Sequence, residues 1–245
     1  KAEINRLEDR VSKLREAAKE EAGQSARDFT GDGNRQYLTG LNLGGNRIAI
    51  LIDVSASMLA DSIVNVIRLR NMDSELQRSA DKWQRALNTV DWLTSQLPIN
   101  SQYQIIAFNT EAQPVLSGTA GKWLEVADAA QLKAATEALR ERLPSGGTNL
   151  HGAFDAVTAL PGGPDNIFLI TDGLPTQSYE PPRRTTISGR DRLSLFRKAV
   201  QRLPSGVPVN IILAPMEGDP MAASEFWQLA QVSGGSFMSP SRDWP

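Results

Sequence analysis

Cysteine is absent from the 245 residues, and histidine occurs once, at His151. The lack of cysteine excludes a disulfide scaffold, a thiolate nucleophile, a cysteine-based zinc site and an iron–sulfur cluster. A single histidine excludes a histidine-rich metal site. The 26 basic and 28 acidic side chains nearly cancel, to a formal net charge of −2. This balance excludes a nucleic-acid binder that is steered by bulk charge, and we expect no nucleic-acid partner.

Long apolar runs are also missing. The longest nearly apolar stretch, Ile48–Ile52, has the length of a strand, and no run approaches the roughly 18 residues of a membrane span. No signal-peptide pattern opens the chain. The sequence begins with Lys1 rather than methionine, so we expect a processed or trimmed chain with an upstream part that is not seen.

Short apolar runs alternate with helical patterns from Arg47 onward. None of the runs alternates cleanly between polar and apolar residues, which is typical of strands buried on both faces of a parallel sheet. Strands are predicted at 48–53, 103–108, 166–172 and 209–214, with shorter ones near 115 and 236–238. Helices are predicted at about 82–97, 128–143, 191–203 and 220–233. This order predicts an α/β fold with a doubly wound, Rossmann-like, mostly parallel sheet.

The first 29 residues differ in composition from the rest, with seven basic and seven acidic side chains. Apolar residues recur there in steps of three and four, at Ile4, Leu7, Val11, Leu14 and Ala18. This pattern predicts an N-terminal amphipathic helix that either packs on the domain or forms the end of a coiled-coil stalk. In the second case the chain self-associates through residues 1–29. Residues 30–46 are rich in Gly and Asn and are interpreted as a linker to a domain at 47–245.

Oxygen-bearing side chains follow the predicted strands where these end. Asp53, Ser55 and Ser57 leave the first strand on one turn, and Asp172 ends the strand at 166–172. The glycine-bearing segment 145–150 is expected to bring the Thr148 hydroxyl to the same edge, where ligands bind in doubly wound sheets.

Two carboxylates and three hydroxyls, with no nitrogen or sulfur ligand, favour a hard cation. We expect Mg²⁺, with Mn²⁺ or Ca²⁺ as alternatives. Taken singly, Asp53, Thr148 and Asp172 could instead cap helices or turns. Taken together, the two carboxylates would lack a counterion, and a metal ion would supply one.

The pattern Asp53-x-Ser55-x-Ser57, followed by Thr148 and by Asp172-Gly173, resembles the metal-ion-dependent adhesion site of von Willebrand factor type A (VWA) domains. The segments SGGTNLHGAF and NIFLITDGLPT are most similar to bacterial relatives of the inter-alpha-trypsin inhibitor heavy chains. The resemblance implies direct metal binding by the three hydroxyls and mostly water-mediated binding by the two carboxylates. It also implies a protein partner whose Asp or Glu completes the coordination. The resemblance favours an extracytoplasmic, membrane-tethered setting, with a cytoplasmic setting as the alternative. Position 56 is Ala where the family often has Gly, which leaves the geometry of this turn open.

Two segments at this edge are unusually long. Residues 58–81 separate the Ser57 turn from the expected helix at Lys82, and residues 175–191 carry Tyr179, Arg183 and Arg184. We interpret both as determinants of partner choice rather than as simple covers of the sheet. The arginines would favour an acidic partner.

The favoured function is a metal-dependent protein-binding module without enzymatic activity. One alternative is a metal-dependent hydrolase on the same sheet, but no lysine or histidine is clearly placed as its acid or base. Another alternative is an oligomeric scaffold held by residues 1–29 to an upstream membrane anchor. His151 is interpreted as a helix-face residue beside the metal loop. The sequence contains no phosphate-binding loop, no G-x-G-x-x-G and no G-x-S-x-G motif.

Overall fold

The computed structural model describes residues 41, 43–180, 186–241 and 244. Its seven-stranded sheet has the order β3-β2-β1-β5-β6-β7, with β4 paired to β2 beside this path. Five strands run parallel: β1 (Arg47–Asp53), β2 (Gln102–Phe108), β5 (Asn166–Thr171), β6 (Val209–Leu213) and the edge strand β7 (Phe237–Met238). The short strands β3 (Ala112–Pro114) and β4 (Leu124–Glu125) pair antiparallel with β2. The predicted fold class is confirmed.

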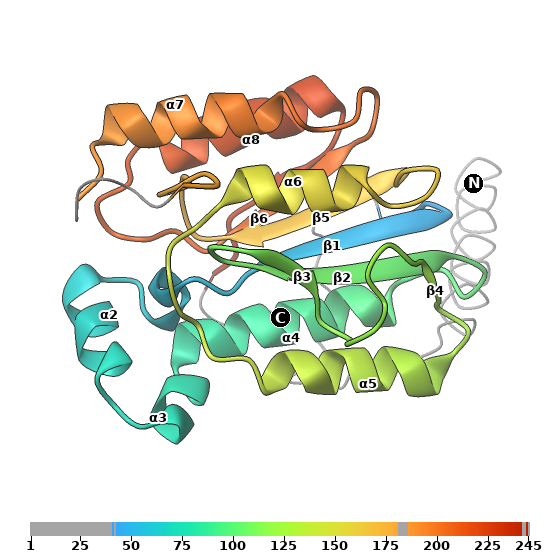
Figure 1. Cartoon of the computed structure of the whole chain (residues 1–245), viewed down its shortest axis with the longest axis horizontal. Coiled ribbons are helices and arrows are strands. Elements are labelled where there is room, and N and C mark those ends of the chain that lie inside the picture. The colour runs from blue at the N-terminus through green and yellow to red at the C-terminus, as the bar shows by residue number, and fades with distance from the viewer. Residues whose placement is uncertain (1–40, 42, 181–185, 242–243, 245) are drawn as a thin grey trace, which may run out of the picture.

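Helices cover both faces of the sheet (Figure 1). One layer holds α4 (Asp81–Ser95) and α5 (Ala129–Arg140). The other holds α6 (Leu150–Thr158), α7 (Gly189–Val200) and α8 (Ala222–Ser233). A 3-10 turn, η1 (Ala56–Leu59), and two short helices, α2 (Ile63–Arg70) and α3 (Ser74–Arg78), lie between β1 and α4.

The central strands show why the sequence lacked polar alternation. In β1, Ile48, Ile50 and Ile52 face the core under α4 and α5, whereas Ala49 and Leu51 face the core under α6 to α8. All five side chains are fully buried, because both faces of the strand are covered. The helices add apolar stripes at helical spacing, as with Trp83, Ala86, Val90 and Leu93 on α4.

The predicted N-terminal helix at 1–29 and most of the predicted linker at 30–46 lie outside the described residues. Leu41 and Leu43 pack against the α4 and α5 core, and the Gly44 carbonyl accepts a hydrogen bond from Asn166 Nδ2 at 2.6 Å. The end of the predicted linker therefore lies on the domain. No helix among the described residues is long and apolar enough to cross a membrane.

Candidate functional site

The sheet order changes direction between β1 and β5. The chain proceeds from β1 outward to β2 and β3, then returns to β5 on the other side of β1 and continues to β6 and β7. Ligands of doubly wound sheets bind outside the carboxyl ends of strands at such a switch point. Asp53 ends β1, and Asp172 directly follows the neighbouring β5. The register that pairs Ile52 with Ile170 brings these two carboxylates to the same edge.

Asp53 shapes the turn that carries the two serines. Its Oδ1 accepts a 2.8 Å hydrogen bond from the Ser55 backbone N–H, and its Oδ2 accepts one of 2.9 Å from the Thr171 hydroxyl. The Asp53 side chain therefore has a fixed orientation beneath the Ser55 turn. No described non-glycine residue has positive φ, so Ala56 fits this turn without the left-handed backbone conformation that would favour glycine.

The serine hydroxyls form a chain with Asp172. Ser55 Oγ and Ser57 Oγ are 3.0 Å apart, and Ser57 Oγ donates to Asp172 Oδ1, also at 3.0 Å. Oxygens that bind one Mg²⁺ at about 2.1 Å in adjacent octahedral positions lie roughly 3.0 Å from each other. The spacing of the two serine hydroxyls therefore fits adjacent positions on one hard cation, and Asp172 Oδ1 lies beside them as a hydrogen-bond acceptor of Ser57. No cluster of three or more His, Cys, Asp or Glu side chains among the described residues is placed to hold a metal, so such a site would depend on hydroxyls.

Thr148 lies on a loop that is fastened to the same turn. The Ala56 N–H donates to the Gly146 carbonyl at 3.1 Å, and the Ser145 N–H donates to the Val54 carbonyl at 2.8 Å. The Thr148 N–H donates to Thr176 Oγ1 at 2.9 Å. Thr148 is buried, and its hydroxyl makes no hydrogen bond with the serines or the carboxylates.

The Thr148 loop is closely packed, and its neighbour caps the next helix. A Cβ on Gly147 would lie 2.6 Å from Thr176 Oγ1, so a larger residue here would displace the Thr176 side chain. The side chain of Asn149 caps α6 by accepting from the Gly152 N–H. The alternative that Thr148 caps this helix is therefore wrong.

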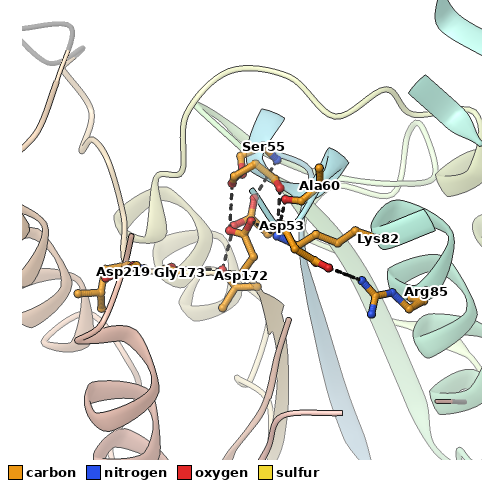
Figure 2. Close-up of polar contacts among 12 residues, drawn as sticks. Asp53, Ser55, Ala60, Lys82, Arg85, Asp172, Gly173 and Asp219 are labelled. Atoms are coloured by element: carbon orange, nitrogen blue, oxygen red, sulfur yellow. Dashed lines mark hydrogen bonds and ion pairs between the residues drawn. The ribbon is translucent and has the colours of Figure 1, made fainter. Parts of the chain in front are cut away.

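Lys82, at the start of α4, was not predicted as part of the site. Its ammonium donates to Asp172 Oδ2 at 2.7 Å, to the Ser57 carbonyl at 3.1 Å and to the Ala60 carbonyl at 3.2 Å. Its side chain is only 1% exposed, and these three acceptors match its three donors. Figure 2 shows Lys82 pointing from α4 toward the cluster that contains Asp53, Ser55 and Asp172.

The ammonium corrects one step of the sequence argument. We expected the two carboxylates to lack a counterion, but Lys82 provides one to Asp172. The sequence held a signal for this, because Lys82 precedes the buried Ala86 by one helical turn and so lies on the buried stripe of α4.

Asp53 has no cation of its own among the described residues. Burial raises the pKa of Asp53 from 3.8 to about 7, and the negative charge of Asp172 is the second cause of this rise. The hydrogen bonds from Ser55 and Thr171 lower the pKa, but by less than the other two causes raise it. The ionised form of Asp53 is therefore unfavourable in the metal-free site. A cation bound beside it would favour ionisation.

An ion pair holds the backbone that follows Asp172. Asp219 Oδ2 accepts from Arg192 Nη2 and from the Leu174 N–H, both at 2.7 Å, while Arg192 Nε donates to the Leu174 carbonyl at 3.1 Å. Asp219 approaches on the side of Asp172 opposite Lys82 (Figure 2). A Cβ on Gly173 would lie 2.7 Å from Asp219 Oδ2, so the ion pair fits closely only over a glycine. Sequence reasoning missed both partners, because they lie on separate elements.

The predicted partner-binding residues have different outcomes. Arg183 and Arg184 lie outside the described residues. Tyr179 is 59% exposed, and its hydroxyl donates to Asp155 Oδ2 on α6. His151 is buried on the first turn of α6 with its ring centroid 6.0 Å from that of Tyr179. Burial lowers the pKa of His151, so a neutral helix-face histidine agrees with the interpretation given above.

Comparison with known proteins identifies the class of the chain. The family profile described as von Willebrand factor type A domain matches residues 48–174, just over half of the sequence. The chain therefore belongs to the von Willebrand factor type A domain family. No curated protein sequence matches it.

Solved structures share the fold. The chain is similar to a von Willebrand factor type A protein from Catenulispora acidiphila, with 20% identity and a TM-score of 0.53. That match covers 81% of this chain and 39% of the other, so this chain spans well under half of that relative. Weaker likenesses include the PilB minor pilin from Streptococcus sanguinis (16% identity, TM-score 0.48, 82% and 59% covered). They also include the pilus adhesin SpaC from Lactobacillus rhamnosus GG (15% identity, TM-score 0.48, 86% and 30% covered).

Proposed function

We propose that this chain is a protein-binding module in which a divalent cation links the carboxyl edge of the sheet to an acidic side chain of a partner protein. The observation that carries the proposal is the 3.0 Å spacing of Ser55 Oγ and Ser57 Oγ at the switch point, with Asp172 Oδ1 accepting a hydrogen bond from Ser57 beside them. Membership of the von Willebrand factor type A family supports it. Mg²⁺ is the proposed ion, with Mn²⁺ and Ca²⁺ as alternatives, because all the donors are oxygens.

Each residue has a distinct part in this proposal. The hydroxyls of Ser55, Ser57 and Thr148 would hold the ion directly, and Asp53 and Asp172 would hold it through water. Asp53 orients the Ser55 turn through its hydrogen bond to the backbone N–H. When bound, the cation would supply a strong positive charge with an open position for an outside carboxylate.

Lys82 contributes to the charge balance of the site. Two carboxylates and one ammonium give the protein groups a formal charge of −1 when all are ionised. A divalent cation would leave the site net positive, which favours an additional anionic ligand from outside. This balance supports the choice of an acidic partner.

Binding is favoured over hydrolysis by the surroundings of the titratable groups. Asp53 is fully buried, and Lys82 donates to three protein acceptors, so neither faces a substrate as a general base or acid. The proposed role therefore assigns no catalytic residue. The similarity to bacterial relatives of the inter-alpha-trypsin inhibitor heavy chains and a membrane-tethered setting remain part of this proposal.

The test measures Mg²⁺ binding and partner capture on the same variants. Isothermal titration of Mg²⁺ into EDTA-treated protein should give one site, which is lost in Ser55→Ala/Ser57→Ala. Ser224→Ala removes an exposed hydroxyl on α8 and is the matched control, with unchanged binding expected. Proteins captured on the immobilised domain in Mg²⁺ should be released by EDTA. Absence of Mg²⁺ binding to the wild type would contradict the proposal.

The scaffold alternative concerns residues 1–29, which the structure does not describe. Sedimentation of 1–245 against 30–245 separates the two cases. A larger assembly only in the longer chain supports a stalk, whereas monomers in both remove it. Neither result affects the proposed cation site.

A further inference from the structure

The segment that follows the Ser57 turn carries an exposed apolar surface beside the candidate site. The helix α2 begins after η1 and lies with α3 beyond the carboxyl ends of the strands (Figure 1). The Glu217 N–H donates to the Asp61 carbonyl at 2.9 Å, so the start of α2 is fastened to the segment after β6. The surface therefore has a fixed place next to the serines.

Large apolar side chains are concentrated on this segment. Of the nine large hydrophobic side chains that are exposed among the described residues, five lie within 63–76: Ile63, Val64, Ile67, Met72 and Leu76. Val64 is 75% exposed, and Ile67 is 56% exposed. Clustered apolar exposure is typical of an interaction surface, whereas isolated exposed residues are ordinary. Val64 and Ile67 stabilise the fold little, because most of their surface remains in water.

The two faces of α2 differ in what they contact. At 100° per residue, Ile63, Val64 and Ile67 share one side of the helix, and the buried Val66 lies on the inner side. On the same wheel, Arg68 and Arg70 flank the apolar stripe on its two edges. Both are exposed, and neither guanidinium forms an ion pair with a residue that the structure describes. The outer face of α2 is thus an apolar stripe between two exposed positive charges.

We propose that this outer face of α2 docks an amphipathic protein segment with aliphatic side chains along one side and Asp or Glu at its margins. Charge complementarity selects this occupant, because Arg68 and Arg70 border the stripe and α2 carries no acidic residue. The inference rests on the proposed function in one respect: the segment belongs to the partner whose carboxylate would reach the cation. Binding at two adjacent points would raise affinity and select among acidic partners.

The probe is a short synthetic helical peptide with leucine at positions i, i+3, i+4 and i+7 and glutamate between them. Its affinity for the full chain is measured by fluorescence anisotropy in EDTA, so that no cation contributes. We expect Val64→Ser/Ile67→Ser to weaken binding at least about tenfold, because both central contacts are lost. Arg68→Glu/Arg70→Glu should weaken it by a similar factor. Val232→Ser replaces a valine on α8 that is 81% exposed, and it should leave affinity unchanged.

A second peptide with lysine in place of glutamate tests the charge argument, and we expect it to bind at least about tenfold more weakly. Equal affinity of wild type and Val64→Ser/Ile67→Ser would overturn the inference. Equal affinity of the wild type for the two peptides would also overturn it. No binding of the first peptide to the wild type would overturn it as well, and this includes the case in which residues 1–29 of this chain cover the face. A wild-type dimer that Val64→Ser/Ile67→Ser dissociates would instead assign the face to a second copy. Because these arms contain EDTA, failure of the cation proposal leaves their outcome unchanged.

Discussion

Replacing Lys82 by methionine tests how the candidate site balances its charges. The variant keeps an unbranched apolar stem but removes the ammonium that donates to Asp172, Ser57 and Ala60. Asp172 would then be a buried carboxylate beside Asp53 with no cation. Removing one member of a buried ion pair typically costs about 3–5 kcal/mol, and we expect a loss of that size in the metal-free protein.

Mg²⁺ should reverse much of this loss, because the added charge would replace the missing ammonium. We therefore expect Lys82→Met to bind Mg²⁺ at least about tenfold more tightly than the wild type, a difference of roughly 1.4 kcal/mol. Urea unfolding with and without Mg²⁺ gives both quantities. Lys133→Met removes a lysine that is 69% exposed on α5 and should change stability by less than about 0.5 kcal/mol.

Two results would refute this reasoning. One is a Lys82→Met variant as stable as the wild type in EDTA, which would mean that the buried pair contributes nothing. The other is equal or weaker Mg²⁺ affinity in the variant, which would mean that Lys82 does not oppose the cation. If neither protein responds to Mg²⁺, the cation proposal is wrong, while the structural role of Lys82 is still measured in EDTA.

Further predictions concern the carboxylate and the loop beside it. The pKa of Asp53 is raised from 3.8 to about 7 in the folded protein. At a pH between these two values, Asp53 is therefore protonated in the folded state and ionised in the unfolded state. This residue therefore lowers the free energy of unfolding as pH rises from about 4 to 7. Asp53→Asn should lack this decline in urea unfolding without metal, and it should lose Mg²⁺ binding; identical pH profiles would contradict the assignment. Gly147→Ala should push Thr176 away from the Thr148 N–H, since the new Cβ would lie 2.6 Å from Thr176 Oγ1. We expect it to cost about 1–2 kcal/mol and to weaken Mg²⁺ binding in calorimetry. Gly189→Ala, which meets no atom within 4 Å, should leave Mg²⁺ binding unchanged and raise stability by at most about 1 kcal/mol.

Local sequence pattern was sufficient for the strands and for the sheet edge at which Asp53 and Asp172 meet. Each apolar run became a buried strand, as in Asn166–Thr171, because both of its faces meet helices. Once the strands were assigned, Asp53 and Asp172 had to lie at one edge, since parallel neighbours end together. The two-residue strand β4 was missed, because so short a segment has no detectable period.

Contacts between distant elements could not be predicted in the same way. Lys82 and Asp172 are 90 positions apart, and their contact depends on how α4 packs against the sheet. The Arg192–Asp219 ion pair likewise joins α7 to the segment before α8. The exposure of Ile67 depends on which side of α2 meets the domain, and the apolar sequence of this helix allows either. The sequence thus located the oxygen cluster but not the charged groups that hold it.

The most direct test of the cation site is a crystal of the chain soaked in Mn²⁺, with anomalous diffraction measured at the manganese edge. The account predicts one strong anomalous peak within bonding distance of Ser55 Oγ, Ser57 Oγ and Thr148 Oγ1, next to Asp53 and Asp172. An ordered site with no peak there, or with the peak at another group of residues, would contradict it.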